Sequence, residues 1–101
     1  MEIEYVDKRL ALIETPRAAD AMLPVAVIQT VRRRLPIIKA APDVRTMLNW
    51  KSLGLREQTE SAGEYFVSLS AQWMMILHIK EKNNAMTVVI RGIEEQVRGA
   101  A

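Results

Sequence analysis

The second half of the chain carries three runs of β-forming residues with little sequence between them. Residues 64–70 are rich in aromatic and β-branched side chains and alternate apolar with polar positions from residue 66 onward. Residues 73–80 are apolar on both faces until the end of the run, which indicates a central strand. Residues 85–91 form the third run, and the polar segment 81–84 before it ends in two asparagines, which tolerate the positive φ of a hairpin turn. This order predicts an antiparallel meander.

Two hairpins alone are marginally stable in water, so a helix must cover one face of this sheet. Residues 24–41 fit that role, with Pro24 in the first turn, where a missing N–H costs nothing. Pro36 lies in the interior, where it removes a hydrogen bond and costs about 3 kcal/mol. We therefore expect a kink or two helices there. The apolar positions, spaced by three and four, are Val27, Ile28, Val31, Leu35 and Ile38.

Smaller elements complete the predicted fold. A short strand is expected at residues 3–5, a small helix at 7–14, and a turn capped by Asp43. The predicted class is α+β: an antiparallel sheet, made of the three-stranded meander plus the short N-terminal strand, with two or three helices packed on one face. A chain of 101 residues without a linker or repeat is expected to form one domain, 1–101.

Composition narrows the function classes. The chain has no cysteine, which excludes a disulfide framework, thiol catalysis and Cys-based zinc sites. With one histidine and no clustered carboxylates, no metal site is expected. Residues 1–4 do not resemble a signal peptide, and no apolar run approaches a membrane span, so we expect a soluble cytoplasmic protein. A net charge of +2 and a pI near 9.2 give slight support to a polyanionic partner.

Four segments in the same order point to a family. The chain begins its first helix with Lys-Arg-Leu at residues 8–10, and residues 24–41 resemble a long basic helix. Residues 50–56, Trp-Lys-Ser-Leu-Gly-Leu-Arg, are similar to a Trp-Arg-Leu-His-Pro-Leu-Lys segment, and residues 68–73 resemble a hairpin that usually continues into an arginine. The chain thus resembles the RelE/ParE superfamily of bacterial toxins, most closely the HigB-like plasmid killer branch, over nearly its whole length.

The resemblance implies the toxin component of a type II toxin–antitoxin system, needing no cofactor. Such toxins are typically ribosome-dependent mRNA endoribonucleases that block translation without a metal. The implied partners are an antitoxin of the helix-turn-helix type and the ribosome with its mRNA, and the implied state is a monomer or small homo-oligomer. The chemistry needs a base for the ribose 2′-hydroxyl, cations for the charged phosphorane, and an acid for the leaving oxygen.

Most of the family's chemical positions hold other residues in this chain. The family histidine corresponds to Leu53, the arginine after the hairpin tryptophan to Met74, and the basic or aromatic ending to residues 92–95, which include two glutamates. Arg56 keeps the charge of the family lysine, but a guanidinium stays protonated and cannot transfer a proton. The resemblance therefore predicts a conserved scaffold with a rearranged or lost activity.

The candidate catalytic residues are Arg56, His78, Glu94 and Glu95. His78 has the strand parity of Met74, so it can face the same surface as the replaced arginine; the alternative is a histidine at the rim of the sheet. The two glutamates could supply a base, or they are simply solvated charges.

A basic set on the long helix and the following loop could bind phosphates without reading sequence. The alternative is the solvated side of an amphipathic helix. The candidate RNA-binding residues are Arg32, Arg33, Arg34, Lys39 and Lys51.

Met74 and Met86 are candidate partner-binding residues, because flexible thioether side chains suit surfaces that fit a partner helix. If both point outward, they form an apolar patch; the alternative is a sheet covered on both sides. Three functions follow from these patterns: a working toxin, a toxin-fold binding module that does not cleave, and a nucleic-acid-binding regulator that uses the arginine helix.

Overall fold

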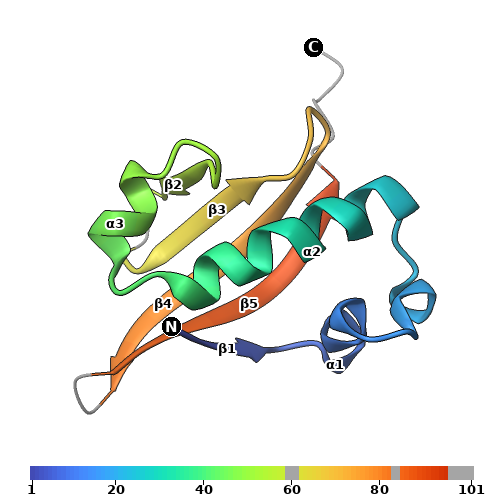
Figure 1. The fold of residues 1–101 in the computed structure, drawn as a ribbon, viewed down its shortest axis with the longest axis horizontal. Helices are drawn as coiled ribbons and strands as arrows, with labels where there is room; N and C mark the ends of the chain where they lie inside the picture. The colour runs from blue at the N-terminus through green and yellow to red at the C-terminus, as the bar shows by residue number, and fades with distance from the viewer. Residues whose placement is uncertain (59–61, 83–84, 96–101) are drawn as a thin grey trace.

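The computed structural model describes residues 1–58, 62–82 and 85–95 and has an α+β fold (Figure 1). A five-stranded sheet with the order β1-β5-β4-β3-β2 carries its helices on one face. The predicted fold class is confirmed. No helix in these three ranges is long and apolar enough to cross a membrane.

The three predicted C-terminal strands form the centre of the sheet. β3 pairs antiparallel with β4, and β4 pairs antiparallel with β5, as the predicted meander requires. Two residues of the predicted turn 81–84 belong to β4, and residues 83–84 lie outside the described ranges. The strand bounds are β1 Glu2–Tyr5, β2 Leu55–Glu57, β3 Glu64–Ser68, β4 Trp73–Lys82 and β5 Ala85–Glu95.

Two features of the sheet go beyond the prediction. The predicted N-terminal strand exists, but β1 runs parallel to β5, so the sheet is mixed rather than antiparallel. At the other edge, β2 pairs antiparallel with β3. With only three residues, β2 carries no alternation that the sequence could reveal.

Local capping rules explain where two helices begin. The Asp43 side chain accepts a hydrogen bond from the backbone N–H of Thr46 at 2.7 Å and acts as an N-cap as predicted. Asp7, predicted as the first residue of the small helix, is an N-cap too and accepts a hydrogen bond from the backbone N–H of Arg9 at 2.9 Å. The predicted helix at 7–14 is an α-turn followed directly by a 3₁₀ turn. The bounds are α1 Lys8–Ala11, the 3₁₀ turns η1 Leu12–Glu14 and η2 Ala18–Ala21, α2 Val25–Ala40, and α3 Val44–Asn49.

Pro36 does not divide the long helix. α2 is one helix of 16 residues with Pro36 inside it, so the expectation of two helices is wrong. Pro36 and Arg32 are both exposed, so water can satisfy the Arg32 carbonyl that loses its helical partner. Leu35 and Ile38 on the opposite side are fully buried and hold the helix against the sheet.

The hydrophobic core lies between α2 and the sheet. The predicted apolar stripe of α2 is buried throughout, and the sheet contributes Val67, Met75, Leu77, Val88 and Ile90, all at most 1% exposed. Figure 1 shows α2 lying across β4 and β5, with no helix of the described ranges on the opposite face. That opposite face, here called the open face, is the part of the sheet left available for binding.

Candidate functional site on the open face of the sheet

Strand alternation decides which side chains reach the open face. On β4, Met75 and Leu77 are buried under the helices, so Met74, Ile76 and His78 point to the open face. Their register partners on β3 share this face: Ser68 lies opposite Met74, Phe66 opposite Ile76, and Glu64 opposite His78.

A β-bulge changes the alternation along β5. Ile76 pairs with Gly92, but the next residue, Leu77, pairs with Ile90, so Arg91 is the extra residue of the bulge. A bulge redirects side chains and increases local twist. Arg91 follows the core residue Ile90 and lies on the open face by ordinary alternation, and the bulge brings Glu94, beyond it, to the same face.

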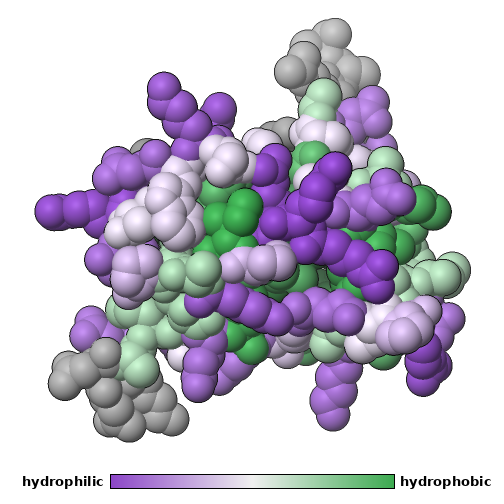
Figure 2. Space-filling view, in the orientation of Figure 1, coloured by the Kyte–Doolittle hydropathy of each residue, from purple (hydrophilic) through white to green (hydrophobic). Residues whose placement is uncertain are grey.

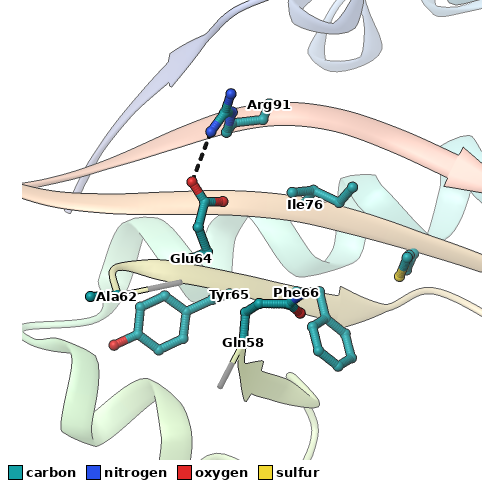
Figure 3. Close-up of a pocket in the computed structure, with 8 residues that line it drawn as sticks. Gln58, Ala62, Glu64, Tyr65, Phe66, Ile76 and Arg91 are labelled. Carbon is teal, nitrogen blue, oxygen red and sulfur yellow. Dashed lines mark hydrogen bonds and ion pairs between the residues drawn. The ribbon is translucent and has the colours of Figure 1, made fainter. Parts of the chain in front are cut away.

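Three charged or titratable side chains from adjacent strands meet on this face. Glu64 Oε1 accepts a hydrogen bond from Arg91 Nη1 at 2.8 Å and lies 3.2 Å from His78 Nδ1. Figure 3 shows Glu64 and Arg91 reaching toward one another over β4. The Glu64 side chain is only 19% exposed, so this carboxylate is largely withdrawn from water. These residues, Glu64, His78 and Arg91, are called the Glu–His–Arg cluster below.

The histidine ring is held against the backbone at Gly63. A Cβ atom at this glycine would lie 3.1 Å from His78 Cε1, and Gly63 has a φ of +81°, which also favours glycine. His78 Nδ1 is buried and has no hydrogen bond of good geometry within the described ranges, although it is at ion-pair distance from Glu64. The His78 side chain as a whole is 38% exposed.

A pocket of about 510 Å³ lies beside this cluster (Figure 3). Glu64 and Arg91 form its polar part, while Phe66, Met74 and Ile76 give it an apolar floor. These three apolar side chains are only partly buried. The pocket can thus hold a ligand that combines a flat apolar group with a negative charge.

The predicted catalytic residues do not meet in one place. Arg56 pairs with Phe66 on the edge strand and Glu94 pairs with Met74 on β5, so three strand spacings, about 14 Å, separate their strands. Glu95 pairs with Trp73 and thus lies on the helix side of the sheet. His78 alone among the predicted catalytic residues belongs to the Glu–His–Arg cluster.

Sequence reasoning missed Glu64 and Arg91. The alternation that places Ser68 on the open face also places Glu64 there, so Glu64 could have been found from its parity. Arg91 shares the parity of Val89, so alternation could have placed it on the open face, but its contact with Glu64 depends on the register between the strands.

Two predicted RNA-binding cations make contacts within the protein. Arg32 donates from Nε to the Ile13 carbonyl at 2.6 Å and from Nη2 to the Thr15 carbonyl at 2.8 Å. Lys39 forms an ion pair with Glu14. These contacts fasten the η1 turn to α2.

Glu14 is the centre of a small network on this side. It also accepts a hydrogen bond from the Tyr5 hydroxyl at 2.7 Å. Burial works to raise the pKa of Glu14, but the hydrogen bonds from Lys39 and Tyr5, with the charge of Lys39, bring the pKa below its usual range. Burial, together with the neighbouring Glu14, raises the pKa of Tyr5.

The other predicted RNA-binding residues differ in exposure. Arg33 and Lys51 are exposed, and among the described residues Arg33 makes only a long hydrogen bond of 3.4 Å to Thr30. Arg34 is partly buried, and its Nε has no hydrogen-bond partner within the described residues. Hydrophilic side chains spread widely over the helix side of the molecule (Figure 2).

Met74 and Met86 lie on opposite faces of the sheet. The hairpin pairs Met86 with Glu81, on the side of Ile79, and Met86 packs against the core. Met74 points to the open face. The two residues therefore form no common patch, because the β4–β5 register places them on different sides.

Comparison with known proteins supports the fold assignment. No protein-family model matches the chain, and no curated protein matches its sequence. Among solved structures, a YoeB/ParE toxin from Agrobacterium tumefaciens is similar, with a TM-score of 0.59 and 11% sequence identity. The match covers 96% of this chain and 100% of that toxin. The chain thus shares the fold of a RelE-like toxin.

Proposed function

We propose that this chain is the toxin of a type II toxin–antitoxin pair, of the HigB-like branch, and that it blocks translation by cutting mRNA on the ribosome. The observation that carries this proposal is the open face: in a fold shared with a YoeB/ParE toxin, one face of the sheet is free of helices from the described part of the chain and holds a pocket beside a cluster of charged side chains. An uncovered concave site of this kind is the usual place for ligand binding.

The side chains of the open face suit RNA. Arg56 and Arg91 are exposed cations that can neutralise phosphates, and His78 can transfer a proton. Phe66 on the pocket floor offers a surface on which an unpaired base can stack. Arg33 and Lys51, exposed elsewhere on the surface, add sequence-independent attraction to ribosomal RNA.

The biological setting follows from the same proposal. The toxin acts in the cytoplasm and is neutralised by an antitoxin, for which a helix-turn-helix protein encoded next to it is the candidate. In this setting the free toxin is a monomer or a small homo-oligomer.

A second candidate function is a toxin-fold binding module that does not cleave RNA. The partly exposed Phe66, Met74 and Ile76 favour it, because a cluster of apolar side chains on an uncovered sheet face suits a protein partner. In this case the open face holds a segment of the partner rather than RNA.

The first test is inducible expression in a bacterial host, with and without the neighbouring short reading frame. We expect growth arrest that the neighbour relieves, and mRNA cleavage in a purified translation system only when ribosomes are present. Arg56→Ala should weaken cleavage by removing a phosphate contact, and Glu94→Ala should have a smaller effect. Undiminished translation at stoichiometric protein would refute the endoribonuclease.

A second measurement separates the two candidates. A partner complex weakened by Met74→Glu but unaffected by Arg56→Ala, in a protein that leaves mRNA intact, supports the binding module. Cleavage that depends on Arg56 supports the toxin.

A further inference from the structure

We propose that Glu64, His78 and Arg91 together form the catalytic group of this protein, with single-stranded RNA as the substrate. The inference rests on the proposed endoribonuclease function and assigns its chemistry to residues at new positions. Of the predicted catalytic residues, Arg56, Glu94 and Glu95 lie on separate strands or faces, whereas His78 lies 3.2 Å from Glu64, which also binds Arg91.

The first step of the argument is the state of the histidine. The Glu64 carboxylate lies 3.2 Å from His78 Nδ1 and favours the tautomer that carries its proton on this nitrogen. Nε2 is then the acceptor of the ring, and the His78 side chain as a whole is 38% exposed. The pair is not aligned as a hydrogen bond in this state, and such contacts commonly tighten only when substrate binds. Glu64 is a positioning residue for His78.

The second step is the cation. Arg91 uses Nη1 to bind Glu64 at 2.8 Å, and a guanidinium has five N–H donors, so others remain for a phosphate. The side chain is 55% exposed and lines the pocket. Arg91 shares the strand parity of Val89, the register partner of His78, so this cation lies on the open face near the histidine. A cation held in advance at this point stabilises the charge that develops on the phosphorane.

The third step is the substrate. Next to the cluster, Phe66 and Ile76 provide an apolar floor for a base, while Arg91 and Glu64 form the polar part of the same pocket. An unstacked nucleotide can place its base on Phe66 and its phosphate near Arg91. A double-stranded helix cannot present a base in this way, so single-stranded RNA fits best.

The reaction balances without any further reagent except water. His78 Nε2 takes the proton of the ribose 2′-hydroxyl, and the 2′-oxygen forms a bond to phosphorus. The bond from phosphorus to the 5′-oxygen breaks, and that oxygen takes a proton from water. The imidazolium returns its proton to the hydroxide that remains. The products are a 2′,3′-cyclic phosphate and a 5′-hydroxyl end.

The test uses the full chain in the ribosome-dependent cleavage assay, with the RNA ends analysed. His78→Ala should slow cleavage by roughly 10²–10⁴-fold, the usual contribution of a proton-transfer group. Added imidazole should restore part of this rate, because a free imidazole replaces the proton acceptor but repairs no structural defect. Glu64→Gln should also slow cleavage, and Glu64→Asp should recover part of the loss. Arg91→Ala should lower kcat, and Arg91→Lys should recover part of it.

Lys80→Ala provides a matched control. Lys80 lies on the same strand as His78 and pairs with Glu4 at 3.4 Å, outside the cluster. The Lys80→Ala substitution removes an ion pair on the open face and should leave the cleavage rate unchanged. Circular dichroism and thermal unfolding show whether each variant is folded.

The outcomes separate this inference from the proposed function. If the unmodified protein cleaves mRNA and the folded His78→Ala variant cleaves equally fast, the cluster is not catalytic but the toxin function stands. If folded His78→Ala is inactive and imidazole restores nothing, His78 is not the proton acceptor. If the unmodified protein cleaves no RNA, both proposals are wrong.

Discussion

The two faces of the sheet use similar side chains for different purposes. On the covered face, Val67, Met75 and Leu77 are completely buried under the helices. On the open face, Met74 and Ile76 are only partly buried and lie beside charged groups. Packing constrains the covered face, while the open face can change its residues without loss of the fold. The shared fold at 11% identity does not by itself define a site.

Charges follow the same division. On the helix side, Arg32 donates hydrogen bonds to backbone carbonyls at η1 and just after it, and Lys39 forms an ion pair with Glu14 of η1. These contacts hold η1 to α2. On the open face, Glu64 and Arg91 pair beside a pocket, where a ligand can reach them. The first set contributes to the stability of the fold, and the second set is placed to act on a ligand.

The largest expected difference in the free energy of unfolding is between two variants that each add one carboxylate, one on the covered face and one on the open face. Met75→Glu places a charge at a position that is 0% exposed, so we expect a loss of roughly 4 kcal/mol or more in the free energy of unfolding. Met74→Glu, the adjacent residue on the open face, should cost about 1 kcal/mol or less. Urea unfolding followed by circular dichroism measures both. Equal losses would mean that the two faces are not distinct.

Local rules explain why much of the fold was predictable. The spacing of apolar residues on α2, the capping role of Asp43 and the alternation along β3 all act over a few residues, and the structure confirms them. Pro36 does not divide the helix, because the packing of Leu35 and Ile38 in the core outweighs the free-energy cost of a proline inside a helix.

The site was less predictable, because it depends on contacts between distant segments. The alternation of side chains along the strand predicts that His78 lies on the same face of the sheet as Met74, and the structure confirms this. The bulge at Arg91 and the pairing of Met86 with Glu81 are set by the register of the β4–β5 hairpin. A sequence pattern within one strand contains no information on such a register.

A smaller effect is expected from the arginines of α2, and it tests whether charges on the helix side support the fold. Arg32→Ala removes two hydrogen bonds to the carbonyls of Ile13 and Thr15 and should cost roughly 1–3 kcal/mol. Arg33→Ala is the matched control, since Arg33 is exposed and its one hydrogen bond to a described residue is long, and it should change stability by about 0.5 kcal/mol or less. Urea midpoints give both values. If Arg33→Ala is the more destabilising variant, Arg32 is not a structural residue.

The smallest expected effect is the loss, at low pH, of the stability that Glu14 contributes to the fold. Its pKa is lower in the folded state, so the unfolded state binds more protons as the pH falls, and Glu14 contributes stability above its unfolded pKa that is lost as pH falls through the folded pKa. Glu14→Gln should therefore reduce stability near pH 7 by roughly 0.2–1 kcal/mol, the range of partly exposed ion pairs. The difference from the unmodified protein should shrink between about pH 5 and pH 3.

Urea unfolding at several pH values measures this difference. Asp7, whose pKa is lowered by hydrogen bonds from Arg9, and Asp43, whose pKa is lowered by the backbone of Thr46, are present in both proteins and cancel. A difference that stays constant from about pH 7 to pH 3 would show that Glu14 acts through packing or neutral hydrogen bonds rather than through its charge.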